Sequence, residues 1–170
     1  MTMHSPLWPK HQYELVNPYA FEAPIAPHIA ADQSGVEIEI GHIKACYEQI
    51  TAQVDVVVIE GAGGWLVPIS ASQTGADMVR ECGWDVVLVV GMRLGCLNHA
   101  LLSVASIAAS QCTLKAWVAN SASTEMLHHA SNIEALKSRI NEPLIATIPW
   151  INTADQEAQD NNNYFSNLPF

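Results

Sequence analysis

The chain has 170 residues and a mass of 18.5 kDa, the size of one ordinary domain. Hydrophobic residues make up 49% and charged residues only 14%, so the chain can bury a sizeable core and is not disordered as a whole. Seven lysines and arginines stand against 17 aspartates and glutamates, a formal net charge of -10. This balance excludes the basic surface of a nucleic-acid-binding protein and the polybasic patch of a membrane-surface protein.

The chain shows no signal for a membrane or an oxidising compartment. Residues 1–13 contain no apolar stretch of the signal-peptide kind, and no apolar run approaches the ~18 residues of a membrane span. The cysteines form no CxxC pair and match no zinc framework. They are Cys46, Cys82, Cys96 and Cys112. We therefore expect reduced thiols in a cytoplasmic protein with no membrane or nucleic-acid partner.

Four short apolar runs, rich in β-branched residues, begin roughly thirty residues apart, which is the spacing of βαβ units. They cover residues 55–59, 86–90, 114–119 and 144–148. Apart from Lys115, each run is continuous rather than alternating, as in strands buried on both faces. We predict four strands at these positions.

Helices are predicted between these runs, over residues 37–53, 97–111 and 124–140, with Thr124 as a possible cap of the last. The alternation predicts an α/β fold with a doubly wound, mostly parallel sheet and helices on both faces. The proline-containing segment 16–27 is predicted to be a structured loop. We expect a single domain over residues 1–170, with a loosely attached tail from about residue 152.

Ligands of open α/β sheets bind at the carboxyl ends of the strands, so the residues after each run are candidates. The first run is followed by Glu60, Gly61, Ala62, Gly63 and Gly64. A carboxylate at a strand end can bind Mg²⁺, and glycines let backbone N–H groups approach a phosphate. The alternative is a glycine-rich turn beside a solvated glutamate.

The second run leads into Gly95, Cys96, Leu97 and Asn98, at the expected start of a helix. Free N–H groups at a helix start attract anions, so a carboxylate or a phosphate is the expected ligand. Alternatively, Asn98 only caps the helix and Gly95 belongs to the preceding turn.

The third run is followed by Asn120 and Ser121. An asparagine amide offers a donor and an acceptor, which suits the edge of a purine, although turns also favour asparagine. The fourth run is followed by Pro149, Trp150 and Ile151, which could form the wall of a base pocket or a loop packed on the core.

Several common catalytic patterns are missing. No HExxH or GxSxG occurs, and no GxxxxGK[ST] phosphate-binding loop can be assembled because no lysine follows a glycine. His128 and His129 are adjacent, so they face different sides of a helix and do not form a two-ligand site. His99 is expected to be a packed helix residue rather than a base.

Five segments, taken in series, resemble dethiobiotin synthetases. They are residues 16–21 with 26–28, 60–65, 95–100, 117–120 and 148–150. They follow the family's order over about residues 13–151, and the series is far more specific than any one segment. The resemblance implies a P-loop NTPase-like fold and an ATP- and Mg²⁺-dependent enzyme of biotin synthesis. Such an enzyme closes the ureido ring on 7,8-diaminononanoate with CO₂, and the family forms homodimers.

The resemblance also implies roles for the candidate residues. Glu60 would bind Mg²⁺, and residues 61–63 would lie against the phosphates of ATP. Asn120 and Ser121 would read the adenine, and residues 149–151 would border it. The helix start at residues 95–98 would bind the substrate carboxylate.

Two departures from the family bear on activity. Ser121 stands where the family often has aspartate. The family's first βα unit, with its glycine- and lysine-containing loop, has no counterpart here, so we expect an N-terminally truncated form. A longer protein, a second polypeptide that supplies the loop and a non-catalytic remnant all stay open. The alternative from another class is a regulatory, dimerising module of the same fold.

Overall fold

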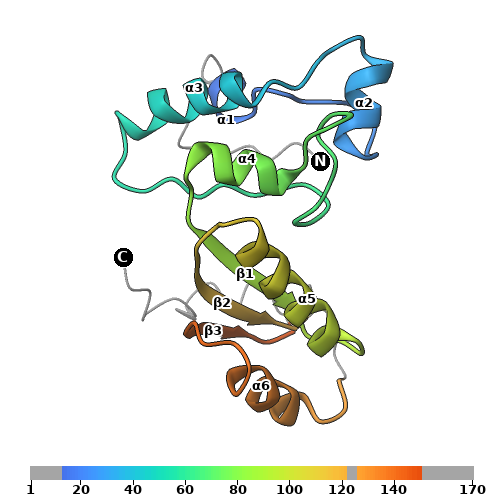
Figure 1. Cartoon of the computed structure of the whole chain (residues 1–170), viewed down its shortest axis with the longest axis vertical. Coiled ribbons are helices and arrows are strands. Elements are labelled where there is room, and N and C mark those ends of the chain that lie inside the picture. Colours follow the sequence, from blue (N-terminus) through green and yellow to red (C-terminus); the bar gives the residue numbers. More distant parts are fainter. Residues whose placement is uncertain (1–12, 122–125, 151–170) are drawn as a thin grey trace. The chain divides into compact units, whose positions relative to one another are not determined.

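The computed structural model describes residues 13–121 and 126–150 (Figure 1). The chain divides into two compact units, residues 1–82 and 83–170. The predicted tail, Thr124 and Ile151 lie outside the described residues, and the single-domain organisation stays a prediction. Within the described ranges no helix is long and apolar enough to cross a bilayer.

The second unit is built on a parallel sheet. Strands β1 (Val86–Gly91), β2 (Leu114–Asn120) and β3 (Leu144–Ile148) lie in the order β1-β2-β3. Helix α5 (Cys96–Ala109) connects β1 to β2, and α6 (His129–Lys137) lies between β2 and β3 in the chain. Parallel neighbours need crossovers of this kind. The α/β class and the parallel sheet are therefore confirmed.

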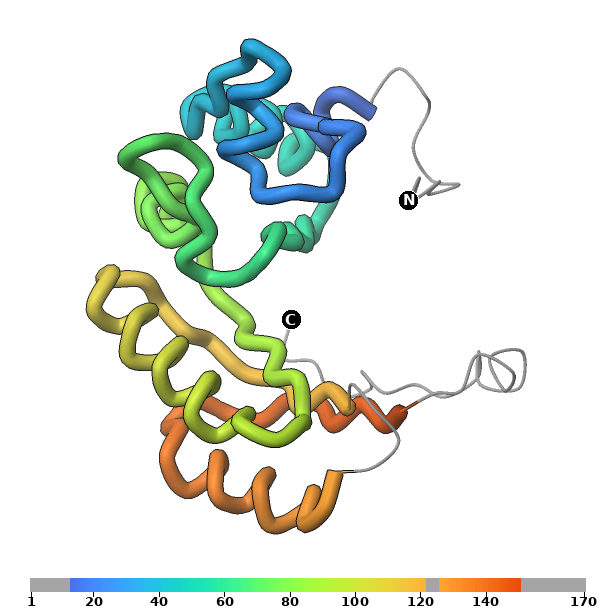
Figure 2. The backbone as a smooth tube through the Cα atoms, turned by 90° about the vertical axis from the view of Figure 1, so that its right-hand side faces the viewer, coloured from blue at the N-terminus to red at the C-terminus, as the bar shows by residue number. Residues whose placement is uncertain are grey.

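Helices α5 and α6 pack on one face of this sheet (Figures 1 and 2). Their shared core contains Val90, Met92, Cys96, Ala100, Trp117, Ala119, Ile133, Leu136 and Ile140. On the opposite side of β1, Val87 and Val89 are 41% and 59% exposed. The alternation shows that β1 is buried on its helix-covered face only.

The prediction of a strand at residues 55–59 is wrong. These residues adopt neither helix nor strand, and Val56 and Val58 are 59% and 89% exposed. A strand exists only through hydrogen bonds to a neighbour, and no described segment forms a ladder with this run. The apolar pattern indicates a tendency to be buried, but it does not show whether a neighbouring strand is present to form the hydrogen bonds.

The first unit contains four helices in its described part: α1 (Tyr13–Val16), α2 (Pro27–Gln33), α3 (Ile40–Thr51) and α4 (Gly75–Cys82). A small core of Ala31, Ile38, Ile40 and Ile69 joins α2 and α3, and Met78 and Cys82 of α4 pack against it. The Tyr19 hydroxyl accepts a hydrogen bond of 3.0 Å from the backbone N–H of Glu39, directly before α3. His28 Nδ1 donates to the carbonyl of Pro68 at 3.2 Å. These contacts fix the loop between α1 and α2, which is a structured loop as predicted.

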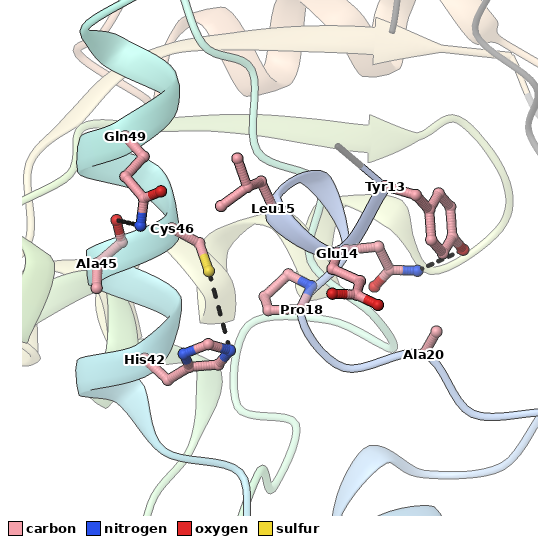
Figure 3. A pocket seen from close by; sticks show the side chains of 10 residues that line it. Tyr13, Glu14, Leu15, Pro18, Ala20, His42, Ala45, Cys46 and Gln49 are labelled. Carbon is pink, nitrogen blue, oxygen red and sulfur yellow. Dashed lines mark hydrogen bonds between the residues drawn. The ribbon is translucent and has the colours of Figure 1, made fainter. Parts of the chain in front are cut away.

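A cavity of about 590 Å³ lies between α1 and α3 (Figure 3). Cys46 and His42 line it from α3, with the Cys46 Sγ 3.9 Å from the His42 Nε2. None of the predicted site residues contributes to its wall.

Helix ends follow local backbone geometry. Helices α3 and α5 lie within the predicted ranges to within a residue, but α6 begins at His129 rather than after Thr124. His128, directly before α6, has a backbone φ of +58°, in the left-handed region. An α-helix cannot continue through this conformation, so α6 starts late.

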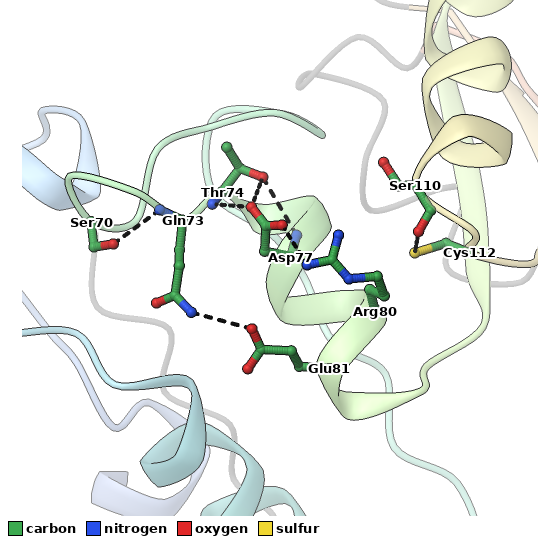
Figure 4. Close-up of polar contacts among 8 residues, drawn as sticks. All are labelled: Ser70, Gln73, Thr74, Asp77, Arg80, Glu81, Ser110 and Cys112. Atoms are coloured by element: carbon green, nitrogen blue, oxygen red, sulfur yellow. Dashed lines mark hydrogen bonds and ion pairs between the residues drawn. The ribbon is translucent and has the colours of Figure 1, made fainter.

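Helix α4, which the periodicity did not predict, begins with a capping box (Figure 4). The Thr74 N–H and hydroxyl donate to Asp77 Oδ2 at 2.8 and 2.7 Å, and the Asp77 N–H donates to Thr74 Oγ1 at 3.4 Å. Arg80 Nη2 pairs with Asp77 Oδ1 at 2.8 Å. The hydrogen bond from the Thr74 hydroxyl, followed by that from its backbone, lowers the pKa of Asp77.

We expect Asp77→Ala to lower the free energy of unfolding at pH 7 by about 1 kcal/mol, the usual value of a cap. Because the pKa of Asp77 is lower in the folded state, its contribution is present at neutral pH. It is lost as the pH falls through this lowered folded-state pKa. Urea unfolding followed by circular dichroism at pH 7 and pH 3 measures the difference.

Glu81→Gln is the matched control, because it removes a carboxylate from the same helix but keeps an acceptor for Gln73. An Asp77→Ala variant that loses as much stability at pH 3 as at pH 7 would contradict the role of the charged carboxylate.

Candidate functional site

The carboxyl ends of the three strands lie together at one edge of the sheet. Gly91 pairs with Asn120, and Asn120 pairs with Ile148. Backbone hydrogen bonds continue past these pairs, from Met92 N to Asn120 O at 2.7 Å and from Ser121 N to Ile148 O at 2.9 Å. The predicted base-reading residues Asn120 and Ser121 are therefore held beside the end of β3.

The side chains at the end of β2 are half-buried. Ser121 Oγ lies 3.1 Å from Nε2 of His129, the first residue of α6. The Asn120 amide makes no hydrogen bond to another described residue, so its donor and acceptor are available to a ligand. Sequence reasoning missed His129, because no local pattern pairs residues eight positions apart across a loop.

The segment after β3 is exposed. Trp150 is 46% exposed, so the alternative of an aromatic residue packed on the core does not apply to it. Pro149 is exposed as well, and Ile151 lies outside the described residues. An exposed indole next to the strand ends can contact a planar group.

The start of α5 leaves backbone N–H groups without acceptors in the helix. Gly95 occupies the N-cap position with a φ of +94°, which favours glycine, and Cys96 is 2% exposed. The backbone N–H groups of Leu97 and Asn98 have no acceptor within the helix, as in any first helical turn. Asn98 is exposed and does not cap α5, so the capping alternative is wrong.

His99 is also exposed, which corrects the expectation of a packed residue. A Cβ atom added to Gly95 would lie 3.6 Å from the His99 ring. The imidazole therefore flanks the N-terminus of α5 instead of entering the core.

The loop after the run 55–59 lies in the first unit. Glu60 is exposed and makes no hydrogen bond or ion pair to another described residue. Gly63 has a φ of +84°, and a Cβ atom there would lie 3.1 Å from Val67 Cγ2, so both conformation and space favour glycine. Gly61 has open space around it, which leaves its backbone accessible.

This loop offers one carboxylate, which suits a metal ion that takes most of its other ligands from a bound substrate and from water. No group of three or more histidine, cysteine, aspartate or glutamate side chains in the described ranges could hold a metal ion. Mg²⁺ is commonly held by one or two carboxylates, with phosphate oxygens and waters completing the octahedron. The unpartnered carboxylate of Glu60 fits one such ligand.

Comparisons with known proteins bear on these residues. A family model described as an AAA domain matches residues 7–158. The chain is 49% identical over 140 residues to the ATP-dependent dethiobiotin synthetase BioD of Aromatoleum aromaticum, and 45% over 139 residues to that of Nitrosospira multiformis. Each match covers 82% of this chain but 62% of the relative. With the enzyme of the same name from Xanthomonas oryzae pv. oryzae the identity is 44% over 151 residues, covering 89% of this chain and 67% of the relative.

The matches confirm the resemblance seen in the five sequence segments. They extend over most of this chain at an identity that leaves no room for a chance likeness, while the chain spans only 62% of the length of two of these relatives. The chain belongs to the dethiobiotin synthetase family.

Proposed function

We propose that this chain serves ATP-dependent dethiobiotin synthesis, the closure of the ureido ring on 7,8-diaminononanoate with CO₂. The observation that carries the proposal is the identity of 44–49% with relatives named for this activity. Its support in the structure is the open amide of Asn120 at the strand ends and the free N–H groups at the start of α5. A complete P-loop is not among the 170 residues, so the proposal concerns the enzyme in its native form.

The reaction requires that the substrates be positioned and that the charge of the phosphate groups be neutralised. One substrate amine adds to CO₂ and becomes a carbamate. A carbamate oxygen then attacks the γ-phosphorus of ATP, the bond to ADP breaks, and a carbamic-phosphoric anhydride forms. The second amine attacks the carbonyl carbon, the new C–N bond closes the ring, and phosphate leaves. Such steps are accelerated mainly by correct positioning of the reactants and by groups that neutralise the charge of the phosphate.

The candidate residues divide this work. Asn120 and Ser121 read the adenine, which residues 149–151 border, and the backbone of Gly61, Ala62 and Gly63 lies against the phosphates. Glu60 would hold Mg²⁺, which supplies neutralisation of phosphate charge when it is bound. In this scheme ATP is a substrate, and Mg²⁺ is the one cofactor.

The start of α5 would bind the carboxylate of 7,8-diaminononanoate through backbone N–H groups and the Asn98 amide. We expect Asn98→Ala to raise the KM for this substrate about tenfold, the effect of one hydrogen bond to a charged group. The KM for ATP should stay nearly unchanged in steady-state kinetics of the native enzyme. Ser103→Ala, on the same helix, is the control and should change neither constant. A change confined to ATP would show that the helix start was assigned to the wrong ligand.

We further infer a cytoplasmic homodimer. The support is the family resemblance, and sedimentation equilibrium of the native protein tests the dimer directly.

The experiment that tests the proposed function isolates the native protein from its source cells and measures its intact mass and its activity. Dethiobiotin formation that requires both ATP and 7,8-diaminononanoate supports the proposal. A mass above 18.5 kDa would show that the native chain is longer than these 170 residues, and a P-loop would then be expected in the additional part. A protein of 18.5 kDa with no turnover, and with no rise in melting temperature on adding 7,8-diaminononanoate, would overturn it in favour of a non-catalytic or dimerising module.

A further inference from the structure

The contact between Ser121 and His129 is fixed from both sides. The Ser121 backbone N–H donates to the carbonyl of Ile148 at 2.9 Å, which holds Ser121 against the end of β3. His129 begins α6, and this helix is anchored to the core by Ile133 and by Leu136, which is 0% exposed. The 3.1 Å separation of Ser121 Oγ and His129 Nε2 therefore follows from packing on both elements.

In the described part of the chain, neither side chain makes another side-chain hydrogen bond. A serine hydroxyl has one hydrogen to donate and two lone pairs that accept. When Nε2 of His129 accepts, the single hydrogen of Ser121 is used and its oxygen can only accept from a ligand. When Nε2 carries the proton, the ring donates, and the Ser121 hydrogen is free to be donated to a ligand.

The neighbouring Asn120 cannot by itself distinguish a 6-amino purine from a 6-oxo purine. Its amide can turn over and present either its oxygen or its nitrogen to the same ligand edge. A 6-amino purine offers a donor at the position where a 6-oxo purine offers an acceptor. Discrimination between them needs a protein group whose direction of hydrogen bonding is fixed, and the Ser121 hydroxyl becomes such a group when Nε2 of His129 accepts its hydrogen.

We propose that His129 is a positioning residue which accepts the Ser121 hydrogen at Nε2, so that Ser121 accepts from a 6-amino purine and disfavours a 6-oxo purine. The inference rests on the proposed function, because it assumes that a purine nucleotide binds at the end of β2. Beyond the proposed function, the inference explains why a 6-amino purine is preferred, and it assigns a role to His129, which lies outside the five family-like segments.

The first test compares the binding of ATP and of inosine triphosphate to the native enzyme by isothermal titration calorimetry. The two nucleotides differ in the amino or oxo group at C6 of the base and in the proton that the 6-oxo base carries on N1. We expect wild type to prefer ATP about tenfold, the value of one hydrogen bond gained against one donor or acceptor left unpaired. In His129→Phe the preference should fall to within about twofold. Ser121→Ala should lower the preference in the same way, because it removes the hydroxyl that His129 is proposed to hold.

His128→Asn is the matched control. It removes the adjacent imidazole, and asparagine tolerates the positive φ of this position. The preference for ATP should be unchanged. A His129→Phe enzyme that keeps the full preference would overturn the inference while leaving nucleotide binding intact. A wild type that binds neither nucleotide would overturn the proposed function at this site as well.

A second measurement needs no nucleotide. The ¹⁵N shifts of the histidine rings distinguish the two neutral tautomers, and His129 should carry its proton on Nδ1. Ser121→Ala should move the His129 ring signals and leave those of His128 in place. A wild-type His129 with its proton on Nε2 would contradict the inference directly.

Discussion

Replacing Glu60 by glutamine should lower kcat/KM for MgATP about a hundredfold in the native enzyme and leave the melting temperature unchanged, since metal-mediated charge stabilisation contributes several kcal/mol. The carboxylate is exposed and has no partner in the described chain, so its loss costs the fold nothing. The amide has nearly the same shape but no charge, and it is a poor ligand for a hard cation. Steady-state kinetics at several Mg²⁺ concentrations measure the effect.

Glu37→Gln provides the matched control, because it removes an exposed carboxylate from the same unit. Its kinetics should be those of the wild type, which separates a site effect from a general change in charge. Unchanged turnover in Glu60→Gln would remove this residue from the site. A loss of turnover that additional Mg²⁺ fully reverses would instead support its role as a metal ligand.

The largest effect on stability is expected at Trp117, in the central strand β2. Trp117 is 0% exposed and packs in the core that joins β1, β2, α5 and α6. Trp117→Ala should lower the free energy of unfolding by about 3–5 kcal/mol, through lost burial and the cavity left behind. Such a loss approaches the whole stability of many domains. Urea unfolding followed by circular dichroism avoids dependence on the fluorescence of the removed indole.

Trp117→Phe refines this prediction. The Trp117 Nε1–H is buried and has no hydrogen-bond partner among the described residues, so phenylalanine removes an unsatisfied donor along with some volume. Its cost should be well below that of alanine. Leu102→Ala, on the exposed side of α5 at 61% exposure, should change stability by no more than about 0.5 kcal/mol. Equal losses for alanine and phenylalanine at position 117 would show that packing volume does not set the cost.

The sequence predicted the three strands of the sheet closely, and it failed at the run 55–59 for a physical reason. All four runs are largely apolar, and this property is local. Strand formation is not local, because each residue needs hydrogen bonds from a neighbour. Val86–Gly91 finds that neighbour in β2, while Val56 and Val58 stay exposed.

Some helix boundaries could likewise be predicted from the sequence, and others could not. The capping box of α4 is visible in the sequence as Thr74 followed three residues later by Asp77, so a search for caps would have found it. The late start of α6 depends on the left-handed backbone of His128, a conformation that is uncommon for any residue except glycine even though histidine adopts it more often than most.

The part of the candidate site whose position follows from the strand order could be predicted from the sequence. Parallel strands place their carboxyl ends at one edge, so Asn120, Ser121 and Pro149 could be assigned to the same region from their spacing. The contact of Ser121 with His129 could not be, because it depends on where α6 begins and how that helix packs. Sequence therefore indicates which residues reach the edge, and packing decides which of them act together.

The outer edge of β1 has a consequence for how the protein behaves in solution. Within the described ranges no strand pairs with this edge, and the valines on its uncovered face are accessible. Unpaired N–H and C=O groups of an edge strand are a template for another strand. A segment that adds there binds the folded sheet and not the unfolded chain, so by mass action it raises the free energy of unfolding. Where such a segment binds, the stability of this sheet depends on the concentration of the segment, and where none binds, the edge is open to pairing between copies of the chain.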